Sequence, residues 1–421
     1  MTSPSRHRRR PPPAADVIDL ADPEVHATVD LGSYFRRLRD EEPVFWQPLD
    51  NGSRPGFWVV TRHDDAVAAC RDSQRFTSVE GNVLATLLGG GDSAGQRMLA
   101  VSDGPRHTQL RKLLLGAISP AATRDIAARI ERNTFGLVAQ ATERDTCDFA
   151  GEVAARIPLA AVCDLLGIPE NDRASVLRHT SAALSSDDPN PTMLAARLAR
   201  NELLLYFARL ARTRSDPDAQ DVVSLLKHAV VDGAPLREED VILNCYSIIL
   251  GGDETTRLAL IRAVVALAEN PTEWQALKEG AVPIPTATEE MLRWSTPALH
   301  VGRTVCVDTD LRGRRLGAGD VITVWIASAN RDEREFDRPE ELRLEREPNR
   351  HLTFSYGPHF CLGAHLARVE MASLLKALVE LVEEIEVVGT PRRIFSNFLS
   401  GFSEAPVRLH PRAEAVEAML A

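Results

Sequence analysis

One cysteine differs from the other five in its surroundings. Cys361 lies in residues 354–363, directly before a predicted helix that begins near Gly363. Unpaired N–H groups at the start of a helix lower the pKa of a nearby thiol. Glycines on both sides let the backbone pass close to a flat ligand. The residues therefore favour a reactive thiolate, and the alternative is an inert cysteine buried in a glycine-rich turn.

A second group of residues lies in the middle of a long apolar stretch. Residues 238–270 are predicted to form a helix that is apolar on nearly all sides, so it should run through the interior. Near its centre, Gly251 and Gly252 each cost about 1 kcal/mol relative to alanine. Polar residues 253–255 follow, although burying polar groups without partners is costly. These costs indicate that a ligand approaches the helix here.

The segment around Cys361 resembles the haem-binding signature of the cytochrome P450 family. The signature F-x-x-G-x-[HR]-x-C-x-G is matched by Phe354, Gly357, His359, Cys361 and Gly363. The resemblance implies that Cys361 is the axial ligand of the iron in haem b, with Gly363 beside it. Such a thiolate pushes electron density onto iron and favours O–O cleavage. Many members have glycine at position 355, where this chain has serine.

The long helix is similar to the family's [AG]-G-x-[DE]-T helix, which crosses the haem. Residues 251–255 match that pattern. The resemblance implies that Gly252 lies against the porphyrin, that Thr255 hydrogen-bonds dioxygen, and that Glu254 belongs to a proton relay. Asp253 and Thr256 are expected to be packing or solvent-facing groups.

Glu290 and Arg293 form a pair of opposite charges at i, i+3, which alone is weak evidence. Their place in the chain matches the family's Glu-x-x-Arg, which implies that they brace the loop around Cys361. The family often adds an arginine from a P-x-R-F segment. Residues 339–342 contain none, so the third partner is open and Arg346 is the candidate.

Haem propionates need cationic partners, and a natural set for two carboxylates has four basic residues. His107 and Arg111 are spaced i, i+4 and share one face of a helix. By resemblance, Arg303 and His359 complete the set.

The substrate pocket is expected to be mostly apolar. If residues 298–303 are extended, Leu299, Val301 and Arg303 share one face. Leu299 and Val301 should then point into the space over the haem. Ile249 on the long helix and Phe398 are expected to complete the wall, together with the loop at 83–99. Each of these apolar residues could instead be ordinary core.

Composition limits the classes of protein that fit. The 421-residue chain is 44% hydrophobic and carries a formal net charge of −11, which argues against a nucleic-acid partner. Arg6 to Arg10 precede three prolines rather than an apolar run, so neither a signal peptide nor a membrane segment is expected. We expect a disordered tail at 1–20, one domain at 21–421 and a cytoplasmic protein.

The predicted fold is mainly α with a small β region, and the resemblance implies the cytochrome P450 fold. A hairpin is expected at 44–61, with its turn at 50–53, and a short helix at 64–72. A long mobile loop is expected at 80–100. Helices are expected at 120–141, 191–214 and from Cys361 to about residue 388.

The resemblance implies a bacterial class I monooxygenase of the actinobacterial type that inserts one oxygen atom from dioxygen into an organic substrate. Electrons would come from a separate ferredoxin and its reductase. Small acidic members commonly tailor polyketides, peptides or terpenes, and the substrate is free or tethered to a carrier protein. Oxidative coupling, epoxidation and nitration remain open, as does a haem-binding sensor without turnover.

Overall fold

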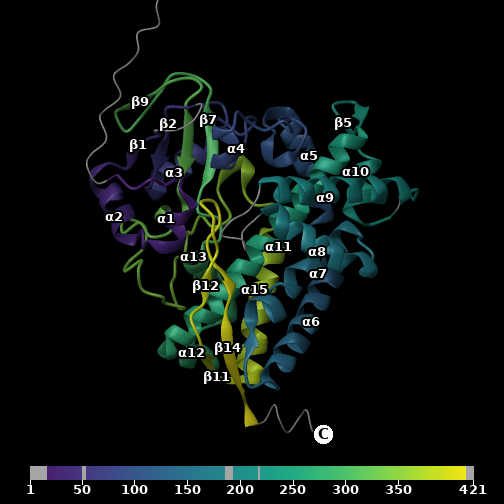
Figure 1. The fold of residues 1–421 in the computed structure, drawn as a ribbon, viewed down its shortest axis with the longest axis vertical. Helices are drawn as coiled ribbons and strands as arrows, with labels where there is room; N and C mark the ends of the chain where they lie inside the picture. Colours follow the sequence, from purple (N-terminus) through teal and green to yellow (C-terminus); the bar gives the residue numbers. More distant parts are fainter. Residues whose placement is uncertain (1–16, 50–53, 185–192, 217–218, 414–421) are drawn as a thin grey trace, which may run out of the picture.

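The computed structural model describes residues 17–49, 54–184, 193–216 and 219–413. Helices dominate it, and a smaller β region lies towards one side (Figure 1). The longer helices are α2 (Gly32–Glu41), α3 (His63–Arg71), α5 (Gly104–Ala117), α6 (Arg124–Thr142), α7 (Arg156–Leu166), α8 (Glu170–Leu184), α9 (Met193–Thr213), α11 (Glu238–Glu269), α12 (Pro271–Lys278), α13 (Ile284–Ser295) and α15 (Ala364–Leu381). The shorter ones are α1 (Pro23–Thr28), α4 (Leu84–Leu88), η1 (Leu99–Val101), η2 (Ala150–Ala154), α10 (Val222–Lys227), α14 (Ile326–Ala329) and η3 (Gly357–His359).

The largest sheet has the order β1-β2-β10-β7-β3. Its strands are β1 (Val44–Pro48), β2 (Gly56–Val60), β3 (Phe76–Thr77), β7 (Val301–Val305) and β10 (Val321–Val324). The antiparallel pairing of β1 with β2 confirms the predicted hairpin strands, while its turn at 50–53 lies outside the described residues. β7 pairs with β10, with Arg303 opposite Ile322. This sheet therefore holds the segment predicted to carry Val301 and Arg303.

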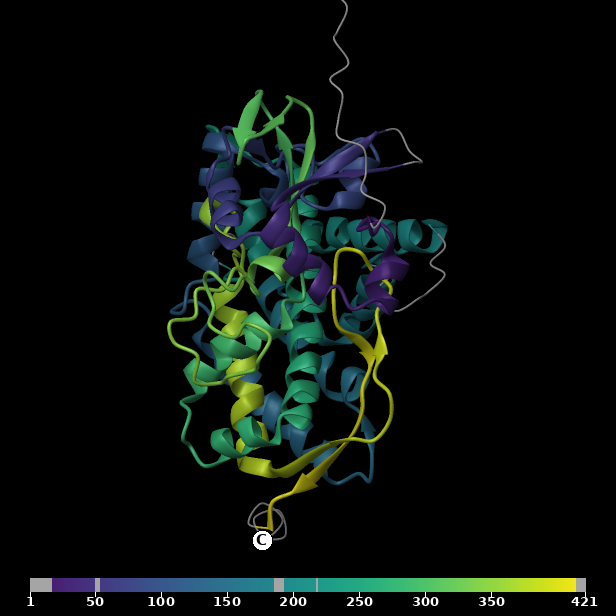
Figure 2. The same cartoon turned by 90° about the vertical axis from the view of Figure 1, so that its left-hand side faces the viewer.

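The other strands form small sheets. They are β4 (Cys147–Asp148), β5 (Val230–Val231), β6 (Ala234–Pro235), β8 (Thr309–Leu311), β9 (Arg314–Leu316), β11 (Val382–Val387), β12 (Arg392–Arg393), β13 (Phe402–Glu404) and β14 (Pro406–Pro411). Asn397, between β12 and β13, donates to the carbonyl of Ala21 over 2.6 Å. The C-terminal hairpin thus lies beside the N-terminal helices (Figure 2).

The helix after Cys361 is shorter than predicted. It ends at Leu381, and Val382–Val387 forms β11 instead of continuing to residue 388. Val382, Ile385 and Val387 are β-branched, and β11 pairs antiparallel with β14. Sheet pairing therefore overrides helical continuation here.

Two predictions of irregular structure were also wrong. The segment 80–100 contains α4 and the start of η1, and Leu84 and Leu87 are fully buried. The predicted tail at 1–20 is ordered from residue 17, because Leu20 is fully buried and Val17 and Ile18 pack against the cluster around Trp325. Residues 1–16 lie outside the described part of the chain.

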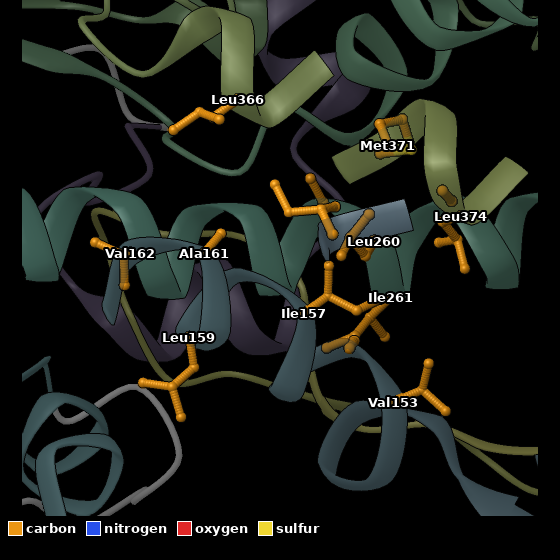
Figure 3. Packing of buried hydrophobic residues seen from close by; sticks show 14 of the residues in the cluster. Val153, Ile157, Leu159, Ala161, Val162, Leu260, Ile261, Leu366, Met371 and Leu374 are labelled. Atoms are coloured by element: carbon orange, nitrogen blue, oxygen red, sulfur yellow. The ribbon is translucent and has the colours of Figure 1, made fainter. Parts of the chain in front are cut away.

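α11 passes through the core, as its all-round apolarity predicts. Its first turn carries Glu238, Glu239 and Asp240, which favour a helix N-terminus, and Pro271 follows its end. Side chains of α7 and α15, including Val162, Leu366 and Met371, pack around it (Figure 3). No helix in the described ranges is both long and apolar enough to cross a bilayer.

Candidate active site

A cavity of about 350 Å³ lies between α11 and the loop that carries Cys361. Cys361 is exposed to this cavity, although it lies deep in the fold. The opposite wall contains Gly251, Gly252 and Thr255 of α11. The two segments that the sequence singled out therefore face each other across one space.

Local backbone geometry sets the Cys361 loop. The N–H of Cys361 donates to the carbonyl of Phe354 over 2.8 Å, and α15 begins three residues later. Gly357 has φ +73°, and a Cβ there would come within 2.7 Å of the carbonyl oxygen of Cys70. Ser355 has φ +60°, a region that normally favours glycine. The loop thus needs glycine at 357 and carries a strained serine at 355.

Burial raises the pKa of the Cys361 thiol. The backbone N–H of Gly363, the Arg111 guanidinium, Arg368 and the N–H of Ala364 lower this pKa. The helix start therefore acts in the predicted direction, but burial has the larger effect on this pKa.

One face of α11 forms the distal wall. The Thr255 hydroxyl donates to the Gly251 carbonyl over 2.8 Å, one turn back along the helix. A Cβ at Gly252 would lie 3.2 Å from the Val162 side chain. Thr255 lines the cavity, and a Cβ at neighbouring Gly251 would meet nothing within 4 Å.

The prediction that Ile249 lines the cavity was wrong. Ile249 is fully buried in the core, whereas Asn244, Ser247 and Ile248 line the cavity. Thr255 and Ile248 are seven residues apart and share a helix face, while Ile249 is turned by about 100° from it. Counting back from Thr255 in steps of three and four would have found the correct residues.

Glu254 does not line the cavity. Its carboxylate accepts two hydrogen bonds from Arg257, at 2.9 Å from Nε and 2.5 Å from Nη2, and both side chains are buried. This pairing holds the carboxylate away from Thr255. The geometry therefore does not bring Glu254 into the predicted relay.

Two neighbouring carboxyl groups are buried without such a partner. Asp253 is 1% exposed, so the expectation that it faces solvent was wrong. Its neighbour Thr256, expected to be a packing group, lines the cavity. Neither carboxyl oxygen of Asp253 has a hydrogen-bond partner, and burial, followed by the charge of Glu254, raises its pKa to about 8. Burial, followed by the charge of Asp253, also raises the pKa of Glu370, which lines the cavity. Burial therefore favours the protonated form of both groups.

The four predicted basic residues lie around the cavity together. His107, Arg111, Arg303 and His359 all line it, and the rings of His107 and His359 are 4.4 Å apart. His359 contacts the Asp103 carboxylate over 2.9 Å. Burial and the neighbouring His359 lower the pKa of His107 to about 4, so its imidazole is neutral.

This set fits the haem b that the resemblance implies. The Nε2 atom of His107 is buried without a hydrogen-bond partner. Buried Arg303 donates to the carbonyl of Gly302, and within the described ranges neither Arg303 nor Arg111 pairs with a carboxylate. Unpaired cations around one cavity suit a ligand with two carboxylates, and Cys361 supplies sulfur for its iron.

The Glu290–Arg293 pair is completely buried beneath the loop. Arg293 donates from Nε and Nη2 to the two oxygens of Glu290, each over 2.7 Å, and its Nη1 donates to the carbonyls of Asn330 and Pro339. Arg346 is confirmed as the third partner, because its Nε lies 3.0 Å from Glu290 Oε2. Asn349 Nδ2 donates to the same oxygen over 3.0 Å. The network braces the segments that lead to Cys361.

Val301 lines the cavity with Arg303, as predicted, but Leu299 and Phe398 do not. Leu299 lies before β7 and packs with Trp325, and its N–H donates to the carbonyl of Phe398. The alternation of side chains expected for a strand holds only from Val301, where β7 begins, and not for residues 297–300. Ala298 therefore lines the cavity, and Leu299 does not. Phe398 packs with Leu258 in a separate cluster.

Comparison with known proteins identifies the family. The family model described as Cytochrome P450 matches residues 285–392. The chain is 46% identical to "Cytochrome P450 NovI" of Streptomyces niveus over 94% of this chain and 98% of that protein. It is 32% identical to "Linalool 8-monooxygenase" of Pseudomonas putida over 94% and 99% of the two chains.

A solved structure has the same fold. The crystal structure of P450 OxyD, described as involved in the biosynthesis of vancomycin-type antibiotics, has a TM-score of 0.86 and 36% identity. The alignment covers 94% of this chain and all of that one. With haem b as the cofactor of the family, and with relatives named as monooxygenases, the chain is an oxidoreductase that uses a redox partner and a small-molecule substrate. It belongs to the cytochrome P450 family.

Proposed function

We propose that this monooxygenase oxidises an apolar organic substrate in the tailoring of a secondary metabolite, with Cys361 as the axial thiolate. The observation that carries the proposal is the single cavity shared by Cys361 and Thr255. The OxyD relative, whose description places it in antibiotic biosynthesis, supports this substrate class.

Bound haem supplies the oxidation of the substrate by dioxygen. The protein's own groups hold and orient the reactants. His107, Arg111 and Arg303 would bind the propionates, and Gly252 would let the flat ring approach α11. The Thr255 hydroxyl, with its hydrogen committed to Gly251, presents oxygen lone pairs to the cavity.

The substrate would lie against an apolar wall. Ile248, Leu165, Ala298 and Val301 line the cavity and would exclude water from the reacting carbon. Ser247 is a polar group on the same wall and would orient a substrate oxygen, whereas the Asn244 amide is held by the backbone of Leu99, Arg97 and Asp240. We further propose a ferredoxin and its reductase as the electron source, a cytoplasmic location, and a carrier protein as the holder of the substrate.

The spectrum of the dithionite-reduced protein with carbon monoxide tests the assignment of Cys361. We expect a strongly red-shifted Soret band that is lost in Cys361→Ser. Cys306→Ser is the matched control, because Cys306 is also exposed but lies outside the cavity. An ordinary Soret position in the intact protein, or equal loss in both variants, would contradict the proposal.

A second measurement separates an oxygenase from a haem-binding sensor. Thr255→Ala should divert reducing equivalents from organic product to peroxide, because the variant loses the hydroxyl that faces the cavity. An unchanged ratio of product to reductant consumed would contradict the role proposed for Thr255. A protein that consumes no reductant with any redox partner would favour the sensor.

A further inference from the structure

A second cavity, of about 280 Å³, lies on another side of the molecule. It is enclosed by the N-terminal helices, the end of α13 and the C-terminal hairpin. Figure 2 shows this hairpin beside the N-terminal helices. None of its lining residues lines the haem cavity. Leu299, Leu399 and Arg262, which have no part in the proposed reaction, are among them.

Four arginines surround this cavity, and two of them are neutralised by acidic neighbours. Arg39 pairs with Glu333 over 3.0 Å, and Arg331 pairs with Glu340 over 3.1 Å. The remaining two are Arg262 and Arg393. Within the described ranges, neither forms an ion pair with a carboxylate.

Arg262 is the more enclosed of these two arginines. Its Nε atom is buried without a hydrogen-bond partner, and its guanidinium lies 5.8 Å from the centre of the Phe402 ring. Burial, followed by the charges of Arg331 and Arg393, lowers the pKa of Arg262 to about 10. Arg262 is half-buried, and its enclosed Nε atom near two other cations is stabilised when a negative charge joins it.

The rest of the wall offers little compensation to Arg262. Glu340 is held by Arg331, and Asp30, the other carboxylate on the wall, forms no ion pair with Arg262 or Arg393 in the described part of the chain. Other lining residues are apolar, among them Phe35, Trp294 and Ile394. The cavity thus combines surplus positive charge with an apolar surface.

We propose that this second cavity binds a small organic anion, whose oxyanion head pairs with Arg262 and Arg393 and whose short apolar body lies against Trp294 and Ile394. Guanidinium groups suit carboxylate and phosphate heads alike, because both accept paired N–H groups. The size of the cavity limits the ligand to a small molecule.

Calorimetric titration of the haem-loaded protein with hexanoate tests this proposal. Hexanoate should bind, whereas hexanamide, which has the same body without the charge, should bind at least about ten-fold more weakly. Inorganic phosphate, which has charge without the body, should also bind more weakly than hexanoate. Hexanoate should leave the Soret band unchanged, because the site lies outside the haem cavity.

Neighbouring arginines provide matched variants. Arg393→Gln and Arg262→Gln should each weaken hexanoate binding at least about ten-fold. Arg392→Gln should leave it unchanged, since Arg392 pairs with Glu404 and does not line the cavity. Arg393 is exposed, so its replacement should not disturb folding even if that of Arg262 does.

Four results would overturn the proposal. They are no binding of hexanoate, equal binding of hexanamide or phosphate, equal effects of Arg392→Gln and Arg393→Gln, and a Soret shift that tracks hexanoate binding. The last would place the anion in the haem cavity.

Discussion

Glu290 and Asp253 are both buried carboxyl groups on helices that build the active site, but the protein treats them in opposite ways. Glu290 is 0% exposed and accepts hydrogen bonds from Arg293, Arg346 and Asn349. Asp253 is 1% exposed, and neither of its oxygens accepts a hydrogen bond. Glu290 is therefore buried among hydrogen-bonded partners, whereas Asp253 is buried with a raised pKa and no hydrogen-bond partner.

The difference shows two ways of tolerating buried acids. A fully paired carboxylate fixes the segments that meet at it, which here lead to Cys361. An unpaired carboxyl avoids the cost of a buried charge by keeping its proton. The first arrangement suits a rigid brace, and the second places protons next to the cavity.

Removing the charge of the paired carboxylate, Glu290, should have the largest effect on stability. Glu290→Gln removes the negative charge between two buried arginines, so we expect a loss of about 3–5 kcal/mol in unfolding free energy. Haem retention should fall as well, because the loop around Cys361 loses its brace. Urea unfolding followed by the Soret band measures both effects.

Glu341→Gln is the control, because Glu341 forms an exposed pair with Arg338 and should matter by less than about 0.5 kcal/mol. Similar losses in the two variants would show that the buried network does not brace the loop.

Replacing the unpaired acid should instead stabilise the protein in a pH-dependent way. Below pH 4, Asp253 is protonated in both states. Between pH 4 and 8 the unfolded state loses the proton and the folded state keeps it, so native stability falls by up to about 1.4 kcal/mol per pH unit. Asp253→Asn removes this effect, and its advantage should grow over that range to the order of 2–4 kcal/mol at pH 7.

Unfolding midpoints at pH 5 and pH 8 measure this growth. Asp145→Asn, which changes an exposed carboxylate, should show no such growth. A difference between Asp253→Asn and the parent that is constant with pH would mean that Asp253 is charged in the folded protein.

The smallest effect is expected in the loop itself. Ser355 has φ +60°, where glycine has no steric penalty, so Ser355→Gly should stabilise the protein by about 0.5–1 kcal/mol. Ser355→Ala keeps the strained backbone and should give no gain. A loss of stability in Ser355→Gly would show that the serine hydroxyl, 3.8 Å from the Cys70 sulfur, matters more than the strain.

The sequence predicted the segments that carry the functional motifs well, because each motif is formed by residues close together in the chain. The Cys361 loop, the glycine pair in α11 and the Glu290–Arg293 pair each lie within about ten residues; the first two line one cavity, and the third is a buried ion pair outside it. The extent of α11, predicted as 238–270 and found as Glu238–Glu269, also followed from its apolarity. Local spacing determines these features because covalent geometry carries them.

Which side chains of a helix or strand face the cavity was less predictable than where the helix or strand lies. Ile248 rather than Ile249 faces the cavity, because helix periodicity measured from Thr255 decides the face. Leu299 does not share a face with Val301, because the chain becomes a regular strand only at β7.

Other features depended on partners far away in the chain. The end of α15 at Leu381 depends on β14, and the order at Leu20 depends on the cluster around Trp325. Whether a buried carboxyl group finds a hydrogen-bond partner also depended on residues far away in the chain. Glu290 meets Arg346 from 56 residues away, whereas Asp253 is buried among neighbours that offer no hydrogen bond.

The sequence by itself thus determined the cytochrome P450 motifs and the long helix α11, which carries one of them. Only the tertiary structure decided which buried groups are paired, since burial and pairing depend on residues that meet through folding.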